Sequence, residues 1–153
     1  NSGQLLENRL HFLYLEDIEN RGGGKEAYMW NVIICDGDEP EREQLMGFVR
    51  QYFEEKKKDA QIAGCMDWPE LEGMVKQSLP DVVIVAQNSV DGLNTITSAR
   101  LLSRKIIWFS DLDFGVQAYR LCVPYFSTKP VTYQKMEQAL TRFFEVSPWL
   151  GKT

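Results

Sequence analysis

The residues best placed for chemistry lie in a polar loop that follows a buried strand. Residues 80–92 begin with a proline, continue through four β-branched residues, and reach a polar loop that ends in Asp91-Gly92. A short run that is apolar at every position and bounded by turn residues predicts a strand buried on both faces of a parallel sheet. In open α/β sheets, ligands bind at the carboxyl ends of such strands. The residue at that point is Ala86, whose methyl group can do no chemistry.

Other catalytic arrangements are missing from the sequence. The only histidine, His11, precedes the regular part of the chain, and no nucleophile has a paired base. No glycine-rich phosphate loop supports a nucleotide or flavin, and no CxxC spacing supports redox chemistry or zinc. We therefore expect that the chain is not an enzyme and that it holds no metal or cofactor.

Composition narrows the class of protein further. The chain has 153 residues, of which 44% are hydrophobic and 25% charged, as in an ordinary single globular domain. A net charge of -5 gives no basic surface for nucleic acid, and no apolar run approaches the roughly 20 residues that span a membrane. The odd number of cysteines, Cys35, Cys65 and Cys122, indicates reduced thiols in a cytoplasmic protein rather than a disulfide framework.

Alternation of strands and helices predicts the fold that must position the loop after residue 85. Five segments read as strands, at 31–35, 60–65, 80–86, 105–109 and 123–128. Helices are expected after the cap Asp38, after the cap Asp67, and over 93–103, 111–121 and 132–145. Five βα repeats predict an α/β fold with a single doubly wound, five-stranded parallel sheet, a flavodoxin-like three-layer (βα)5 sandwich.

The two ends of the chain differ from this pattern. Residues 1–28 carry a weak amphipathic stripe over about 4–19 and then a break of three glycines. This N-terminal extension is either an added segment without function or a docking or dimerising helix. The domain itself is expected over 29–146, and residues 147–153 read as a short linker.

The order of these local patterns resembles the receiver domain of response regulators, the CheY-like family of two-component systems. The matching segments are Ile34–Leu45 with its acidic turn, Pro80–Ala86 with Asp91-Gly92, Ile106–Ser110, and Lys129-Pro130. The segments 113–119 and 129–133 are similar to receivers that precede DNA-binding domains of the LytTR type. The resemblance covers about residues 29–146.

The resemblance also implies that the usual phosphorylation site is degenerate. The position of the phosphoacceptor aspartate is held by Ala86, which cannot form an acyl phosphate. Of the acidic pair that would bind Mg²⁺, Asp36 remains but its neighbour is Gly37, and Asp38 is better explained as a helix cap. Mg²⁺ binding is therefore not expected. The switch hydroxyl and lysine of the family correspond to Ser110 and Lys129.

Two interpretations of Ser110 and Lys129 stay open. In the structural one, Ser110 ends a strand and caps the next helix, while Lys129 pairs with the buried carboxylate of Asp36. In the other, both side chains are kept as a switch-like network. Phe126 takes the position of the aromatic switch of the family, and as an apolar strand residue it could also simply pack in the core.

Two functions follow from the resemblance. The favoured one is a pseudo-receiver in signal transduction and transcription regulation, which acts through protein contacts on the face formed by 111–121, 123–128 and 132–145. Tyr119, Val123, Tyr125 and Phe126 would supply that face, for a homodimer or for a C-terminal DNA-binding output domain absent from this chain. The alternative is a sensor of a small metabolite, with a pocket lined by Asp36, Gly37, Ala86, Gln87 and Asn88.

Overall fold

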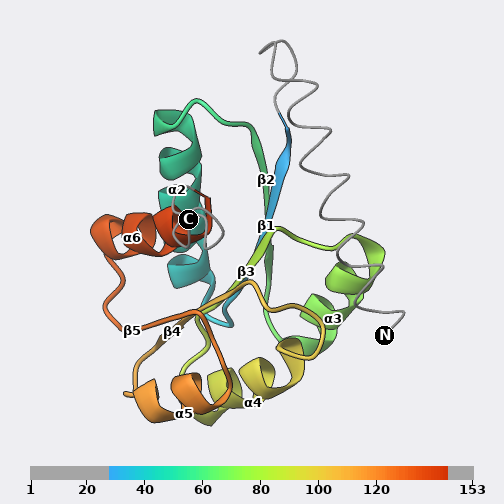
Figure 1. Ribbon diagram of the computed structural model, residues 1–153, viewed down its shortest axis with the longest axis vertical. Helices are drawn as coiled ribbons and strands as arrows, with labels where there is room; N and C mark the ends of the chain where they lie inside the picture. Colours follow the sequence, from blue (N-terminus) through green and yellow to red (C-terminus); the bar gives the residue numbers. More distant parts are fainter. Residues whose placement is uncertain (1–27, 145–153) are drawn as a thin grey trace, which may run out of the picture.

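A single parallel sheet organises the computed structural model, which describes residues 28–144 (Figure 1). The order of the five strands is β2-β1-β3-β4-β5, and every neighbouring pair is parallel. The predicted doubly wound α/β sheet is confirmed. In chain order the elements are β1 (Trp30–Cys35), α2 (Glu39–Glu55), β2 (Ala60–Cys65), α3 (Trp68–Gln77), β3 (Val82–Val85), α4 (Ser89–Ala99), β4 (Ile106–Ser110), α5 (Gly115–Arg120), β5 (Tyr125–Thr128) and α6 (Tyr133–Phe144).

The order in which the chain adds strands to the sheet changes direction between β1 and β3, although the two strands are parallel. The chain steps from β1 outward to β2, and then crosses back to β3 on the other side of β1 before it continues to β4 and β5. Cys35 and Val85, the last residues of β1 and β3, are register partners. The residues that follow them, Asp36 and Ala86, therefore emerge side by side at the point where an open α/β sheet binds its ligands.

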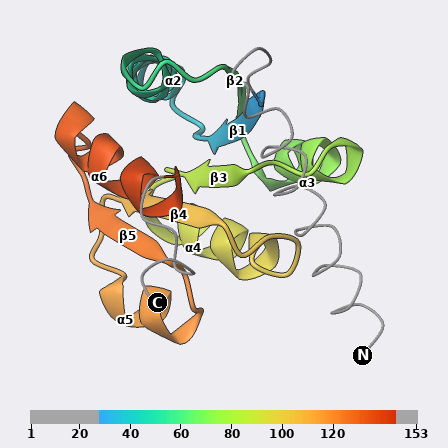
Figure 2. The same ribbon diagram turned by 45° about the horizontal axis from the view of Figure 1, so that its top comes forward.

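Two hydrophobic layers hold the helices on the sheet. Helices α2 and α6 cover one face and α3, α4 and α5 the other, as the turned view shows (Figure 2). All four residues of β3 are buried, which confirms the reading of the run 82–85 as a strand covered on both faces. The largest fully buried side chains include Trp108 and Phe109, which come from consecutive positions of β4 and so belong to opposite layers.

Helix α4 begins four residues earlier than the sequence predicts and ends earlier as well. The predicted helix over 93–103 runs from Ser89 to Ala99, because the loop after β3 is short and turns into the helix at Ser89, where φ is 55°. Asp91-Gly92 is consequently part of the first helical turn and not a turn that closes the loop, so that expectation was wrong. A Cβ atom on Gly92 would lie 2.4 Å from the carbonyl oxygen of Gln87, which only glycine avoids.

The helix expected over 111–121 forms only at Gly115–Arg120. The residues before it are held in turns by side-chain oxygens: Oγ of Ser110 accepts from the amide of Leu112, and Oδ1 of Asp113 accepts from the amide of Gly115. Such local bonds compete with helix formation. The other boundaries differ from the expected ones by two residues or fewer.

The two helix caps predicted from aspartates have different outcomes. Asp67 precedes α3, and its side chain accepts a hydrogen bond from the amide of Glu70 at 3.2 Å, as predicted. Asp38 occupies the N-cap position of α2, but its side chain makes no capping hydrogen bond.

The predicted terminal segments, 1–28 and 147–153, lie outside the described residues except for Tyr28. Among residues 28–144 no helix combines the length and the apolar character needed to cross a membrane.

Candidate functional site

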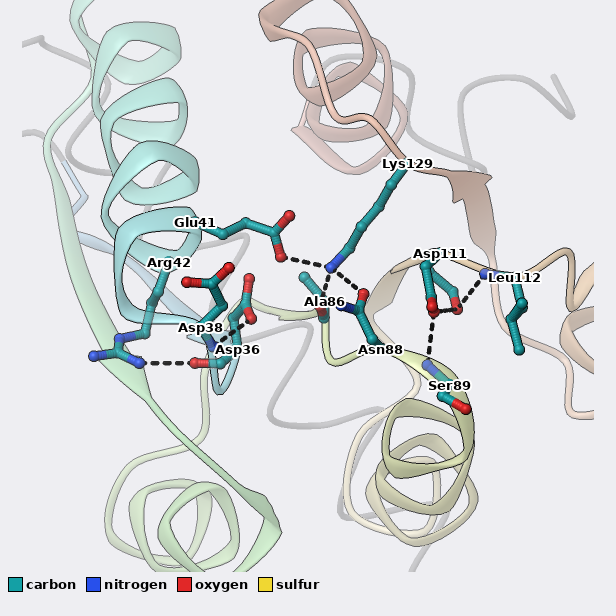
Figure 3. Close-up of polar contacts among 11 residues, drawn as sticks. Asp36, Asp38, Glu41, Arg42, Ala86, Asn88, Ser89, Asp111, Leu112 and Lys129 are labelled. Carbon is teal, nitrogen blue, oxygen red and sulfur yellow. Dashed lines mark hydrogen bonds and ion pairs between the residues drawn. The ribbon is translucent and has the colours of Figure 1, made fainter.

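The sheet brings the four candidate residues to its carboxyl edge from four different strands, and Figure 3 shows Asp36, Ala86 and Lys129 there. Asp36 follows β1, Ala86 follows β3, Ser110 ends β4 and Lys129 follows β5. Figure 3 shows that Glu41, from the first turn of α2, points toward the same place. Glu41 was not among the candidates from the sequence.

Lys129 is the centre of this cluster. Its Nζ atom donates to Oε1 of Glu41 at 2.5 Å, to the carbonyl oxygen of Ala86 at 2.6 Å and to Oδ1 of Asn88 at 2.6 Å. An ammonium group has three N–H donors. All three are therefore engaged by acceptors of the protein, and the side chain is only 10% exposed.

The expected pairing of Lys129 with Asp36 is wrong, because Glu41 takes its place. Helix α2 begins at Glu39, so its first turn lies over the carboxyl edge of the sheet, and the longer side chain of Glu41 reaches the ammonium group. Asp36 instead stays close to the backbone, where its Oδ1 atom accepts from the amide of Asp38 at 3.0 Å.

Ala86 enters the site through its backbone. The residue is fully buried, and its methyl group belongs to the layer under α2 and α6. Its amide donates to the carbonyl oxygen of Cys35 at 2.8 Å, while its own carbonyl accepts from Lys129. The position that the resemblance assigns to the phosphoacceptor therefore offers the lysine a neutral carbonyl oxygen and no carboxylate.

Asp36 and Glu41 form a coupled acidic pair. Asp36 is 2% exposed, and its Oδ2 atom receives no hydrogen bond from the part of the chain that the structure describes. Burial, and then the hydrogen bond with the Glu41 carboxyl, raise the pKa of Asp36 to about 7, although the amide of Asp38 works against the rise. A carboxyl group with this pKa carries its proton for part of the time at neutral pH.

The pKa of Glu41 moves in the opposite direction. Burial alone would raise it, but the hydrogen bonds from Asp36 and Lys129 and the charge of the lysine outweigh burial and hold the pKa below its usual value. Of the two carboxyl groups, Asp36 is therefore the one that takes up a proton first, while Glu41 is the ionised partner of Lys129. The ammonium group thus has its counter-charge within the protein.

Ser110 lies in a second polar network. Its buried Oγ atom donates to Oδ1 of Asp111 at 3.3 Å and accepts from the amide of Leu112 at 3.2 Å. Oδ1 of Asp111 in turn accepts from the amide of Ser89 at 2.6 Å. Ser110 therefore ends its strand, as the structural interpretation expects, but it closes a turn and does not cap α5, which begins at Gly115. The amide of Lys129 donates to the carbonyl oxygen of Ser110 at 2.8 Å, but within residues 28–144 no hydrogen bond joins the Oγ atom of Ser110 to the ammonium group of Lys129.

The remaining carboxylates do not fit a magnesium ion. Within 28–144 no group of three or more histidine, cysteine, aspartate or glutamate side chains is arranged to hold a metal. Asp36 is buried and takes up a proton before Glu41 does, Glu41 is bound to Lys129, and Asp38 is exposed at the start of α2. Mg²⁺ usually keeps several waters in an octahedral shell and is held by one or two ionised carboxylates that point toward it. This donor set does not supply them.

The residues expected on the interaction face differ in exposure. Tyr119 is 84% exposed, whereas Val123, Tyr125 and Phe126 are half-buried. The Phe126 ring packs edge-on against Trp108 with 5.0 Å between centroids, and Tyr125 packs against Phe109 with 6.1 Å between centroids.

The exposed apolar surface of this face comes mainly from α5 and the turn before it. Leu112, in the turn before α5, is 47% exposed, and Val116 is 60% exposed and lies three residues before Tyr119 on the helix. Sequence reasoning named only Tyr119 of these three. We call Leu112, Val116 and Tyr119 the α5 surface.

Two hollows of the described surface lie away from the pocket expected for a metabolite. One, of about 330 Å³, lies between the start of β4 and the segment before β5 and is lined by residues including Arg100, Ile106 and Val123. Another, of about 160 Å³, is lined by residues including Asn31, Gln61 and Gln77. Neither is lined by Asp36, Gly37, Ala86, Gln87 or Asn88.

Comparison with known proteins defines the class of fold. No protein-family model and no curated protein sequence matches the chain. Solved structures do match, and those most like it include a candidate response regulator from Chloroflexus aurantiacus, with a TM-score of 0.63 and 16% identity over 76% of this chain and 98% of that one. The signal receiver domain of the candidate response regulator NarL from Mycobacterium tuberculosis has a TM-score of 0.58 and 20% identity, over 74% and 94% of the two chains.

A third similar structure is a longer protein. RcsB from Salmonella enterica serovar Typhimurium, solved on the promoter rprA with the phosphomimetic BeF3-, has a TM-score of 0.55 and 18% identity, over 80% of this chain and 65% of RcsB. At these identities the likeness establishes the fold, which is the CheY-like, flavodoxin-like α/β fold of response-regulator receiver domains.

Proposed function

We propose that this chain is a pseudo-receiver domain, which transmits signals through protein contacts and is not switched by phosphorylation of an aspartate. The observation that carries the proposal is the complete engagement of Lys129 by Glu41, Ala86 and Asn88. A lysine with three internal partners has no donor left for a phosphoryl oxygen.

Each requirement of aspartate phosphorylation is unmet at this edge of the sheet. The reaction needs a carboxylate nucleophile, and position 86 carries a methyl group. It needs a cation to neutralise the charge of the transferred group, and the acidic side chains are protonated, paired or turned to solvent. The domain is accordingly proposed to have no catalytic activity and no cofactor.

The internal network favours one arrangement of the loops around it. Glu41 belongs to α2, Asn88 to the loop after β3 and Lys129 to the end of β5, so a single ammonium group ties three distant segments together. In a receiver that is switched, these segments respond to a phosphoryl group. Here Glu41 supplies the negative charge permanently, which supports a domain whose surface is presented in a constant form.

The α5 surface is the proposed contact site. Its three apolar side chains are exposed, and α5 packs against β5, which is an edge strand of the sheet. We propose that it contacts a second copy of the chain or an output domain in the intact protein. RcsB is a similar protein that binds a promoter, and the sequence resemblance to receivers of LytTR-type regulators points to a DNA-binding output and a role in cytoplasmic transcription regulation.

An amide NMR titration with Mg²⁺ and beryllofluoride tests the proposal, together with the intact mass after incubation with a small phosphodonor. We expect no saturable shifts at Ser110 and Lys129 and no added phosphoryl mass. The matched control is the variant Ala86→Asp, which adds only the missing carboxylate. Saturable shifts in the native chain, or a phosphoryl adduct on it, would overturn the proposal.

A further inference from the structure

Two cysteines that are far apart in the sequence face each other in the sheet. Cys35 is the last residue of β1, Cys65 is the last residue of β2, and the two are register partners on neighbouring parallel strands. Neighbouring strands lie about 4.8 Å apart, and a disulfide joins residues whose Cα atoms are about 4.4 to 6.8 Å apart. The spacing of the two strands therefore lies within the range of Cα separations that a disulfide spans.

The side chains also lie on the same side of the sheet. Both belong to the hydrophobic layer under α3, α4 and α5, and their exposed fractions are 0% and 2%. Both are free thiols in this structure. The hydrogen bond with the Cys65 thiol, followed by burial, raises the pKa of Cys35, so that this thiol stays protonated. A direct contact between the two sulfur-bearing side chains is implied.

The positions of the two cysteines in the sheet determine which thiol an oxidant reaches first. Strand β2 is an edge of the sheet, and Cys65 is followed by Met66, whose side chain is 54% exposed. Cys35 is enclosed between β2 and β3. Cys65 is thus the thiol nearer to solvent, and because a buried thiol is poorly reactive, the oxidant must be small enough to reach the sheet edge.

We propose that Cys35 and Cys65 are an oxidant-responsive pair, which hydrogen peroxide converts reversibly into an intramolecular disulfide. The thiolate of Cys65 attacks one peroxide oxygen, the O–O bond breaks, and the leaving hydroxide takes a proton to become water. The sulfenic acid formed on Cys65 is then attacked by the sulfur of Cys35, whose proton leaves with the hydroxyl group as a second water. Two thiols are oxidised, and one peroxide is reduced to two waters.

The pair is connected to the site through the backbone. The carbonyl oxygen of Cys35 accepts from the amide of Ala86 at 2.8 Å, and that of Cys65 accepts from the amide of Asp36 at 3.0 Å. A shift of the two strands on disulfide formation would therefore be passed to Ala86 and Asp36, each through one backbone hydrogen bond. The inference does not depend on the proposed function, since it uses only the geometry of β1 and β2.

The test uses the full chain with Cys122→Ser, because Cys122 is exposed and would form bonds between molecules. The folded protein is treated with hydrogen peroxide, unfolded in an alkylating agent and analysed by peptide mapping. We expect both free thiols to disappear, a linked peptide pair whose mass is lower by two hydrogen atoms, and full recovery with dithiothreitol. The amide signals of Asp36 and Ala86 should shift on oxidation.

Two variants serve as controls, Cys35→Ser and Cys65→Ser, each combined with Cys122→Ser. Each keeps one buried thiol and should give no linked peptide. The proposal is overturned if the folded chain keeps both thiols, if the disulfide forms only in a denaturant, or if oxidation yields sulfinic acid without a linked peptide.

Discussion

Two polar networks lie at the same edge of the sheet, a lysine network around Lys129 and a serine network around Ser110. They differ in how far apart in the sequence their members are. In the lysine network, Lys129 reaches partners that are 88, 43 and 41 positions away in the sequence. In the serine network, the Oγ atom of Ser110 bonds only to the next two residues. The loop after β3 touches both, since Asn88 belongs to the first network and Ser89 to the second.

The difference shows that single residues of a receiver site can be present in a sequence although the side-chain contacts of that site are not. Ser110 and Lys129 match a receiver hydroxyl and lysine in sequence, and their backbones are hydrogen-bonded, yet within 28–144 no side-chain hydrogen bond or ion pair joins the hydroxyl to the ammonium group. The lysine network cross-links the fold, while the serine network closes a local turn before α5. Substitutions should therefore have unequal effects on the two.

The largest effect is expected where one change disturbs both networks. Gly92→Ala places a methyl group 2.4 Å from the carbonyl oxygen of Gln87, so the loop that carries Asn88 and Ser89 must move. We expect a loss of about 3 kcal/mol in the free energy of unfolding, measured with urea. The control is Gly73→Ala in α3, where nothing lies within 4 Å of the new methyl group and a gain of about 0.5–1 kcal/mol is expected. Equal effects of the two variants would contradict the account.

Removal of the ammonium group breaks the lysine network alone. Lys129→Met leaves Glu41 and the carbonyl of Ala86 without their donor in a half-buried place, which should cost about 2–3 kcal/mol. Lys76→Met is the matched control, because Lys76 and its partner Glu72 are exposed, and a loss below about 0.5 kcal/mol is expected. Urea unfolding measures both. A loss for Lys129→Met as small as that of the control would mean that the network contributes nothing to stability.

The acidic pair should make stability depend on pH. Because the pKa of Asp36 is raised to about 7 from 3.8, the folded state binds a proton that the unfolded state releases. Its contribution is complete below pH 3.8 and is lost as pH rises through 7, so stability should fall by about 2 kcal/mol between pH 5 and 7.5. The shift of Glu41 acts in the opposite direction only below its usual pKa of 4.5. Asp36→Asn should flatten the curve, and a curve unchanged by this variant would refute the assignment.

The smallest effect is expected in the serine network. Ser110→Ala removes the acceptor of the Leu112 amide from a local turn and should cost about 0.5–1 kcal/mol. Because no side-chain hydrogen bond joins the hydroxyl of Ser110 to the ammonium group of Lys129, this loss should add to that of Lys129→Met with a coupling energy below about 0.5 kcal/mol in a double-mutant cycle. A coupling energy above about 1 kcal/mol would show that the two networks interact, and it would support the switch-like interpretation of Ser110 and Lys129.

Much of the fold could be predicted because its signals are local. The run Val82–Val85 is apolar at every position, and α2 shows a regular spacing of apolar residues, so the strands and helices follow from neighbouring residues. The start of α4 was missed, because it depends on the contact between Gly92 and Gln87 across the short loop.

The site was harder to predict, because its partners come from distant segments. Glu41 reads as an ordinary acidic residue in the first turn of a helix, and only the packing of α2 beside the end of β5 shows that it meets Lys129. The pairing of Cys35 with Cys65 was equally hidden, since it depends on the register of β1 and β2. A carboxylate a few residues after the acidic turn was the one signal in the sequence that could have suggested Glu41.

A carboxyl ¹³C NMR titration of Asp36 and Glu41, with the Lys129 ammonium signal followed in parallel, tests the central claim most directly. The account predicts that Asp36 titrates at about 7, that Glu41 titrates below 4.5, and that the ammonium signal of Lys129 is protected from exchange with water over the whole range. Titration of Asp36 near 3.8 with a freely exchanging Lys129 would contradict it, because the lysine would then be available to an external ligand.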